Sequence, residues 1–343
     1  MNRRNIAILA LFFVGLIAAV MIYRGTRAEP EAEQFENLQV VMPGAEISAL
    51  LDDGERLWVG TTDGIYWLDR DTGEMLKKLD AKIAMIYAAM IRKTEDGLVW
   101  AGHDAGISAF DAEGNEVRRI TAPEIPGGRV NALLVTEGGL WLGTQEGAAF
   151  LAPEGGEWEV REVLTTENGL AEEVVQVIEQ VGEQIWFGSY LATGQGGISI
   201  RGADGWQYLT PEDGIPHRYI NAILPLSDEC VLIGSGQLIY GGLSLAEKQE
   251  GSWKIMQNWN QDDGIPGMKV RYLFLDSDGR LWINTEADGL LILDSPGKLE
   301  TRPLEGQITK QENGLADDEV KCIVESDTCY WLGGKYGLTR YGK

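Results

Sequence analysis

The sequence repeats one short phrase seven times, and this repeat limits the possible folds more than any other feature does. In its clearest form the phrase is an apolar residue, Trp, another apolar residue, Gly and Thr, followed by a second Gly and an apolar run. Its anchor positions are 58, 100, 141, 186, 232, 282 and 331, so successive copies lie 41 to 50 residues apart. A period in this range is typical of solenoids and propellers, in which each repeat is one supersecondary unit. The copies occupy residues 57–61, 99–103, 140–144, 185–189, 231–235, 281–285 and 330–334.

Each copy divides into short apolar segments separated by turn residues, and the sixth copy illustrates the pattern. Residues 270–275 predict an inner strand, and the Asp-Ser-Asp-Gly sequence at 276–279 predicts a tight turn. Residues 280–285 and 290–294 predict two further strands, and a variable fourth strand follows. Seven repeats of four antiparallel strands predict an all-β fold, a seven-bladed β-propeller. A β-solenoid is the alternative, but the rungs of short β-helices have much shorter periods.

The two ends of the repeat array predict how the ring closes. The last copy stops at its third strand, residues 337–341, and has no fourth strand of its own. Residues 38–42 precede the first inner strand, 47–51, and have no place in the first repeat. We expect this N-terminal strand to complete the last blade, because a propeller must pair that otherwise exposed edge.

The N-terminus carries a long apolar segment. Residues 6–23 are apolar apart from one Gly, and two Arg residues flank them on each side. This length is just enough for a helix to span a bilayer. We therefore predict a signal anchor or transmembrane helix within 1–28, a linker over 29–37 and the propeller over 38–343. The protein would be a single-pass membrane protein with an extracytoplasmic, periplasmic or extracellular propeller; cleavage after Ala28 is the alternative.

The charge of the chain excludes one class of partner. The net charge is −24, and residues beyond position 28 carry 25 basic against 53 acidic side chains. So acidic a surface repels phosphate backbones, so we expect no nucleic-acid partner. It suits solubility and cationic partners.

The cysteines and histidines give little sign of a metal centre. The three cysteines, Cys230, Cys322 and Cys329, lack the paired spacing of a zinc site, and only two histidines are present. We expect no metal and no cofactor. Cys322 and Cys329 flank a predicted turn, which leaves a disulfide between them open in an oxidising compartment.

A second phrase precedes several inner strands, and together the two phrases resemble a known family. Asn-Gly or Asp-Gly followed by Leu or Ile occurs in the segments 166–170, 211–216, 261–266 and 311–315. This phrase, an inner strand, a turn and then Leu-Trp-x-Gly-Thr resemble the two-component-regulator propeller repeat. The resemblance covers about residues 39–343. It is weaker in the second copy, where His103 replaces Thr, and in the fifth, where Leu232 replaces Trp.

The resemblance implies a recognition role. Propellers of this family typically form extracytoplasmic sensory regions of transmembrane regulators, several of them tied to polysaccharide sensing. Here we expect a stand-alone propeller without a kinase or DNA-binding domain. The resemblance thus implies fold and recognition, and not signalling by this chain alone.

The repeated Trp is predicted to be structural, and function is expected in the loops. A large apolar side chain on a strand of alternating burial packs between adjacent blades more readily than it serves as a sugar platform. In this topology, the connection between the second and third strands and the linker into the next inner strand lie on one face, here called the loop face. Loops of this kind carry function on a rigid scaffold.

The loop face is predicted to be acidic. Its acids are Asp63, Asp104, Glu146, Glu286 and Asp288 from the first kind of loop and Glu167, Asp213, Asp263 and Glu312 from the second. Its bases are Arg129, Arg218, Lys269 and Lys335. We interpret this as an acidic funnel for a cationic or hydroxyl-rich ligand or a basic protein surface. A merely solvated rim is the alternative.

One loop and two histidines stand apart from the repeat. The loop 189–197 is several residues longer than its counterparts and carries Tyr190, so it is the best single-loop candidate for contacting a partner. His103 is expected to be a hydrogen-bonded residue between blades. His217 lies on the loop face, but no nucleophile or metal-ligand spacing accompanies it.

The leading hypothesis is a membrane-anchored, non-catalytic propeller that binds a protein, a carbohydrate or a cationic ligand, as the possible sensory partner of a signalling system. The alternatives are a lyase or hydrolase that uses His217 and Asp213 at the channel mouth, and a pure protein-interaction scaffold. The candidate binding residues are Asp63, Asp104, Glu146, Tyr190, Asp213, His217, Arg218, Asp263, Asp288 and Tyr336.

Overall fold

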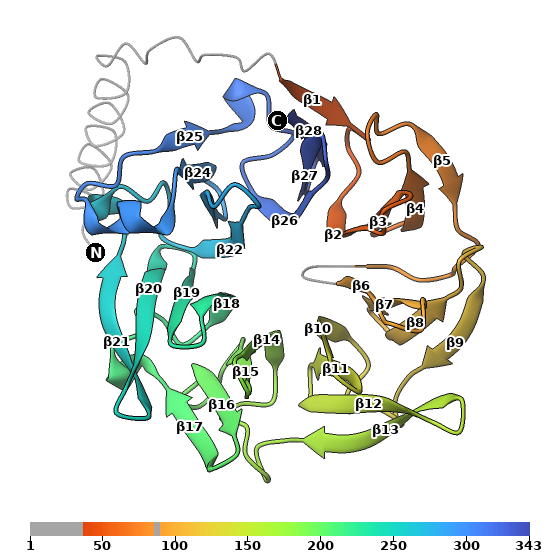
Figure 1. Ribbon diagram of the computed structural model, residues 1–343, viewed down its shortest axis with the longest axis horizontal. Helices are drawn as coiled ribbons and strands as arrows, with labels where there is room; N and C mark the ends of the chain where they lie inside the picture. The colour runs from red at the N-terminus through yellow and green to blue at the C-terminus, as the bar shows by residue number, and fades with distance from the viewer. Residues whose placement is uncertain (1–36, 86–89) are drawn as a thin grey trace, which may run out of the picture. The chain divides into compact units, whose positions relative to one another are not determined.

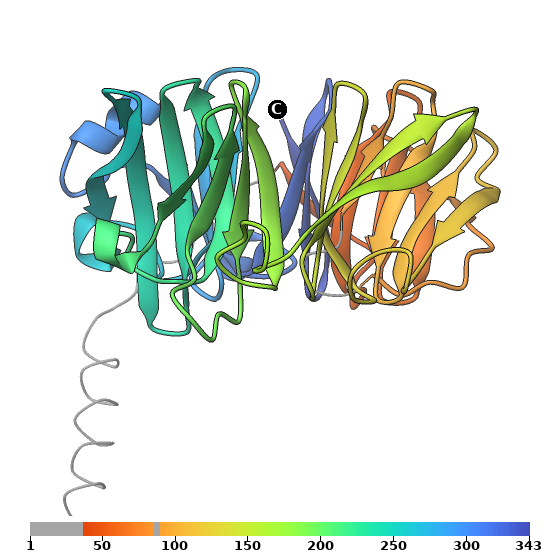
Figure 2. The same cartoon turned by 90° about the horizontal axis from the view of Figure 1, so that it is seen from below.

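The computed structural model describes residues 37–85 and 90–343. The predicted anchor, and the linker up to residue 36, lie outside the described residues. Seven separate four-stranded antiparallel sheets surround a common axis, with one inner strand of each sheet nearest the centre (Figure 1). Seen from the side, the strands run across the thickness of a disc (Figure 2). Within the described ranges, no helix is long and apolar enough to cross a membrane.

The blades are numbered by their inner strands, and each is given from the inner to the outer strand. Blade 1 contains β2 (Ile47–Asp52), β3 (Leu57–Thr61), β4 (Gly64–Leu68) and β5 (Met75–Lys78); blade 2 contains β6 (Ile91–Lys93), β7 (Val99–His103), β8 (Gly106–Phe110) and β9 (Glu116–Ile120). Blade 3 contains β10 (Val130–Thr136), β11 (Gly139–Thr144), β12 (Ala148–Glu154) and β13 (Glu157–Leu164); blade 4 contains β14 (Val175–Val181), β15 (Gln184–Ser189), β16 (Ile198–Gly202) and β17 (Gly205–Leu209). Blade 5 contains β18 (Ile220–Ser227), β19 (Cys230–Gln237), β20 (Tyr240–Gln249) and β21 (Ser252–Trp259). Blade 6 contains β22 (Val270–Leu275), β23 (Leu281–Thr285), β24 (Leu290–Leu293) and β25 (Gln307–Thr309); blade 7 contains β26 (Val320–Glu325), β27 (Cys329–Gly334), β28 (Gly337–Gly342) and β1 (Leu38–Val41).

Blade 7 closes the ring as the sequence predicts. The N-terminal strand β1 pairs antiparallel with β28, with Leu38 opposite Tyr341 and Val41 opposite Leu338. The last and the first strands of the array therefore belong to one sheet, and the edge that β28 would expose is paired.

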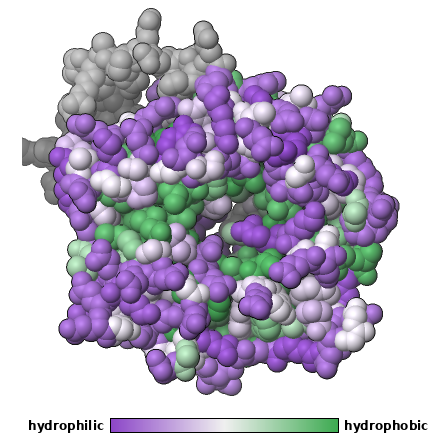
Figure 3. Space-filling view, viewed as in Figure 1, coloured by the Kyte–Doolittle hydropathy of each residue, from purple (hydrophilic) through white to green (hydrophobic). Residues whose placement is uncertain are grey.

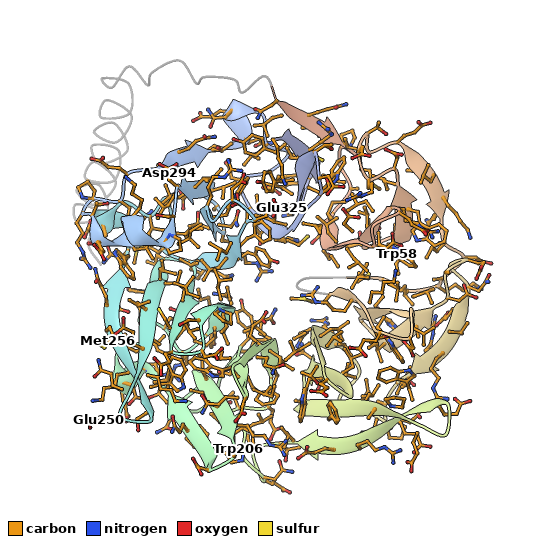
Figure 4. The ribbon with its side chains drawn as sticks, viewed as in Figure 1. Trp58, Trp206, Glu250, Met256, Asp294 and Glu325 are labelled. Atoms are coloured by element: carbon orange, nitrogen blue, oxygen red, sulfur yellow. The ribbon has the colours of Figure 1, made fainter. Side chains whose placement is uncertain are left out.

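The tryptophans of the repeated phrase pack between blades, which confirms their predicted role. Five of the six are at most 1% exposed, and the sixth, Trp141, is 6% exposed. Trp186 meets Trp253 of blade 5 edge to face, with ring centroids 4.8 Å apart, and Trp58 packs against Phe110 of blade 2. Trp58 lies inside the first blade (Figure 4). Such contacts join each sheet to the next, so the repeated phrase stabilises the ring and is not a ligand platform.

Three of the four copies of the second phrase form short helical turns, which the sequence does not predict because it indicates no helix within the propeller. The turns are η1 (Pro211–Asp213), η2 (Gln261–Asp263) and η4 (Gln311–Asn313), and a further one, η3 (Pro296–Glu300), precedes β25. In η1 the phrase's Gly214 has φ +107°, a left-handed conformation that favours glycine. The next residue, Ile215, is 2% exposed. The phrase therefore turns the chain and inserts an apolar anchor ahead of the inner strands of blades 4 to 7.

The disulfide left open by the sequence is not formed. Cys322 lies opposite Gly333 in the β26–β27 pair, while Cys329 lies opposite Gly342 in the β27–β28 pair. The two thiols thus occupy different levels of the sheet. All three cysteines, which lie within the described ranges, are free.

Candidate functional site

The loop face brings together segments from neighbouring blades. Strand direction alternates within each sheet, so the connection between strands two and three and the linker into the next inner strand end at the same face. Contacts join the two kinds of segment. Tyr190, in the connection of blade 4, packs on Tyr219, in the linker to blade 5, with ring centroids 4.9 Å apart. Lys269 Nζ, in the linker to blade 6, pairs with Glu286 Oε1 of that blade's connection at 2.7 Å.

An aromatic and basic cluster occupies the part of this face between blades 4 and 6. The His217 ring meets Tyr219 edge to face at 4.7 Å, and Tyr219 in turn meets Tyr190. The Lys269 ammonium lies 5.8 Å from the centre of the Tyr190 ring. Three rings and a cation from three linkers or connections thus form one contiguous group, here called the aromatic cluster: Tyr190, His217, Tyr219 and Lys269.

The long loop that carries Tyr190 is tied to the propeller by hydrogen bonds. Gly194 N donates to Glu172 Oε1 at 2.5 Å, and Arg218 Nη1 donates to the Gly194 carbonyl at 2.7 Å. Tyr190 N donates to the Val174 carbonyl at 3.0 Å. The loop therefore has a defined conformation, and Arg218 acts as one of its supports.

His217 is held in a neutral form at ordinary pH. Burial lowers the pKa of His217, and the nearby charges of Arg218 and Lys269 lower it further. Its Nδ1 accepts a hydrogen bond from Tyr219 N at 3.0 Å, which fixes the ring. A neutral imidazole packed against a tyrosine can take part in stacking and hydrogen bonding with a polar ligand.

Several of the predicted acidic residues have local partners. Asp63 Oδ2 accepts from Lys78 Nζ at 2.6 Å, and this hydrogen bond is the main reason that the pKa of Asp63 is lowered. Asp213 Oδ2 accepts from Thr210 N and Thr210 Oγ1, each at 2.9 Å, and so caps η1. Asp213 therefore has a structural task in the linker that carries His217.

Asp263 occupies the equivalent position in the linker that leads into blade 6. Its Oδ2 accepts from Asn260 N at 3.1 Å, which caps η2, and its Oδ1 pairs with Arg302 Nη1 at 2.5 Å. The Thr-x-x-Asp and Asn-x-x-Asp spacing is a capping signal that the sequence carries. These two residues are therefore explained by the fold.

The remaining predicted residues are spread over the loop face. Asp104 and Glu146 are exposed at the connections of blades 2 and 3, and Asp288 is half-buried in blade 6. Tyr336 is 53% exposed in blade 7, with the Lys335 ammonium 5.3 Å from its ring centre. The structure thus unites Tyr190 and His217 in the aromatic cluster, with Arg218 beside it, and leaves these four outside it.

The connection of blade 5 exposes an apolar tip that sequence reasoning missed. Leu238, Ile239 and Tyr240 are 76%, 70% and 66% exposed. They form the hairpin end between β19 and β20, on the loop face, where the phrase lacks its Trp. The signal in the sequence was the run of three apolar residues at a position where most of the other repeats have a polar connection.

His103 is hydrogen-bonded as predicted, and its hydrogen bonds lie within blade 2. It is 1% exposed, its Nε2 lies 3.1 Å from Ser108 Oγ, and its Nδ1 accepts from Ala105 N at 3.2 Å. Burial lowers the pKa of His103 to about 4, with a further lowering from the charge of Arg119. It is a neutral packing residue.

The axis of the propeller encloses a cavity of about 550 Å³, lined by inner strands. An opening is visible at the centre of the ring, with hydrophobic surface along part of its edge (Figure 3). On the inner strands, one residue lies directly opposite the Trp position of each repeat. These seven residues are Leu51, Arg92, Leu134, Glu179, Leu224, Phe274 and Val324.

Two of these equivalent positions are charged, whereas the other five are apolar. Arg92 and Glu179 both line the cavity, as do Leu51, Leu224 and Phe274. Burial raises the pKa of Glu179 to about 7, and the charge of Arg92 opposes that rise. Arg92 and Glu179 therefore interact electrostatically within the cavity. Aligning the inner strands of the seven copies would have revealed both residues, since the other copies carry Leu, Phe or Val there.

The comparisons with known proteins agree with this geometry. Residues 264–287 match the family model described as "Two component regulator propeller". That segment of the chain is therefore similar to the two-component regulator propeller repeat. The match begins at Gly264, inside the second phrase, and extends through β22 and β23, so it contains the end of the second phrase and the complete Trp phrase of one blade. No curated protein matches the sequence significantly.

Solved structures of similar fold include extracellular domains of two-component systems. The extracellular domains of two hybrid two-component systems from B. thetaiotaomicron align with TM-scores of 0.71 and 0.67, at 18% and 20% identity. These alignments cover 89% and 90% of this chain, but the chain spans only 41% and 39% of those structures. Virginiamycin B lyase from Staphylococcus aureus aligns with a TM-score of 0.59 at 14% identity, over 89% of this chain and 99% of the lyase. At these identities the likeness is one of fold.

Proposed function

We propose that this chain is a membrane-anchored, extracytoplasmic, non-catalytic propeller that binds a carbohydrate on its loop face, as the sensory part of a signalling system. The aromatic cluster carries the proposal. Ring faces of tyrosine pack on apolar faces of a ligand, and the neighbouring, exposed Arg218 supplies hydrogen-bond donors. The exposed carboxylates of Asp104 and Glu146 could accept from sugar hydroxyls at the same face, in line with the acidic funnel.

The direction of β1 places the first described residues away from the loop face. Leu38 pairs with Tyr341 at the end of β28, and Asn37 Nδ2 donates to the Gly342 carbonyl, so the chain enters the propeller on the face opposite the loop face.

The likeness to extracellular domains of two-component systems supports a sensory role outside the cytoplasm. Catalysis is the weaker alternative, although one structure of similar fold is a lyase. Asp213, the acid predicted to assist His217, accepts from both polar groups of Thr210, and the pKa of His217 is lowered by burial. These contacts favour a structural and binding use of the two residues.

The proposal is tested with the full chain on a glycan array. We expect the wild type to bind at least one glycan, and Tyr190→Ala and Tyr219→Ala each to weaken that binding about tenfold, because each removes a ring from the cluster. Tyr208→Ala is the matched control, since Tyr208 is an exposed tyrosine on the outer strand β17 and should have no effect. Absence of binding to every glycan, or equal binding by all three variants, would contradict the proposal. Turnover of a bound glycan that His217→Ala abolishes would favour the enzyme.

The exposed tip of blade 5 favours a second candidate function, a protein-interaction scaffold. Three adjacent, strongly exposed apolar side chains are unusual on a surface this acidic. We expect Leu238→Ser combined with Ile239→Ser to abolish co-purification of a defined partner and to leave glycan binding unchanged. Loss of glycan binding in this double variant would instead place the tip in the carbohydrate site.

A further inference from the structure

We propose that the axial cavity is a second binding site, distinct from the loop face, for a small zwitterion with an apolar body, such as a free amino acid with a large apolar side chain. The site goes beyond the proposed carbohydrate function. Its volume of about 550 Å³ falls in the range of small-molecule pockets. It combines an apolar wall with two opposite charges, Arg92 and Glu179, that form no ion pair within the described residues, and that combination defines the ligand.

The two charges are placed where the fold has no need of them. At the position opposite the phrase's Trp, blades 1, 3 and 5 carry leucine, which fills the same place without any charge. Arg92 and Glu179 are therefore not required by the packing of the repeat. Arg92 and Glu179 are both half-buried, and a charged side chain that lines a cavity and that packing does not require is typical of a functional site.

Within the described residues, the two charges do not satisfy each other directly. Arg92 Nη1 donates to the Ile91 carbonyl at 3.0 Å, and Arg92 influences Glu179 through its charge without a hydrogen bond between the two side chains. By contrast, the other cations that line the cavity are paired. Arg271 Nε lies 3.3 Å from Glu319 Oε1, and Lys321 Nζ lies 2.6 Å from Glu46 Oε1.

Two further polar groups of the lining lack partners. Ser48, which is 2% exposed, and Asn221 both line the cavity, and the hydroxyl oxygen of the first and the side-chain carbonyl oxygen of the second have no hydrogen bond in the part of the chain that is described. Buried polar atoms are nearly always hydrogen-bonded, so unpaired ones call for a partner. Both lie on inner strands, as Arg92 and Glu179 do. A polar molecule within the cavity would provide that partner.

A zwitterion fits these groups better than a simple ion does. A ligand carboxylate would form an ion pair with the guanidinium of Arg92, and a ligand ammonium would form one with the carboxylate of Glu179. A simple anion would be repelled by the carboxylate of Glu179, and a simple cation would be repelled by the guanidinium of Arg92. The apolar body would pack against Leu51, Leu224 and Phe274.

Isothermal titration of the full chain at about pH 8 with L-phenylalanine, phenethylamine and 3-phenylpropionate tests the proposal, because Glu179 is mostly ionised there. We expect saturable binding of phenylalanine, and at least about tenfold weaker binding of the amine and of the acid. Arg92→Leu and Glu179→Leu should each weaken phenylalanine binding at least about tenfold. Leucine is the residue of three equivalent positions, so both variants should fold, which their melting curves verify.

Two comparisons make the test specific. Arg92→Leu should bind phenethylamine more tightly than the wild type does, because the repelling charge is gone, whereas Glu179→Leu should gain affinity for 3-phenylpropionate. Tyr219→Ala should bind phenylalanine as the wild type does, so failure of the loop-face proposal leaves this result unaffected. Lack of saturable binding of phenylalanine, or unchanged affinity in both leucine variants, overturns the proposal.

Discussion

Replacing Asp276 with alanine is expected to lower the free energy of unfolding by about 3 to 5 kcal/mol, the cost of breaking a buried, hydrogen-bonded ion pair. The Asp276 side chain is fully buried in its ion pair with Arg280, at 2.8 Å. Its Oδ2 also accepts from Trp282 Nε1 at 2.9 Å and from the Tyr330 hydroxyl at 3.1 Å. One carboxylate thus fixes a phrase Trp and joins blade 6 to blade 7.

The pKa of Asp276 agrees with this role. Burial acts to raise it, but the hydrogen bonds from Trp282 and from Arg280 N, with the charge of Arg280, hold it below the ordinary value. A depressed folded-state pKa means that this stabilisation is present above the unfolded pKa and is lost as the pH falls through the folded pKa. The difference between wild type and Asp276→Ala should therefore shrink in acid.

Denaturant unfolding followed by tryptophan fluorescence measures the effect. Asp278→Ala is the matched control in the same turn, because the Asp278 side chain is 67% exposed. It should change the free energy of unfolding by less than about 0.5 kcal/mol. The account of the interblade contact fails if Asp276→Ala is no less stable than this control.

The second large effect concerns Glu179 and has the opposite dependence on pH. Its pKa is raised by burial from 4.5 to about 7. Between these values the folded state holds a proton that the unfolded state has released, so stability falls as the pH rises. At about 1.4 kcal/mol for each pKa unit, the total loss is on the order of 3 kcal/mol by pH 8.

Glu179→Leu removes this titration. We expect the stability of the variant relative to wild type to increase by about 3 kcal/mol between about pH 4.5 and pH 8, as measured by denaturant unfolding across that range. Glu183→Leu, in the turn before β15, is a control for the loss of one acidic residue near the same strand pair. Parallel profiles of the free energy of unfolding against pH for wild type and Glu179→Leu would contradict a raised pKa of Glu179.

The fold could be predicted from the sequence because each copy of the repeat carries its own turn and strand signals. The missing fourth strand of the last copy and the surplus strand expected at 38–42 predicted the closure that β1 and β28 form. The phrase tryptophans were predicted correctly as interblade residues, since a large apolar residue recurring on a strand must be buried.

The candidate site was only partly accessible from the sequence. Tyr190 and His217 were identified as candidates. Tyr219 was not, and Lys269 was named only as a base of the loop face, because their contacts join linkers and connections of three blades. Arg92 and Glu179 were missed because their place is defined by strand register opposite the Trp, and not by the phrase itself.

Hydrogen–deuterium exchange of the full chain, with and without the array glycan of highest affinity, tests the central claim most directly. The claim is that recognition occurs at the aromatic cluster of the loop face. The account predicts slower exchange in residues 189–197 and 217–219, the segments that carry Tyr190, His217 and Tyr219. Unchanged exchange in both segments, with protection confined to the opposite face or the outer strands, would contradict it.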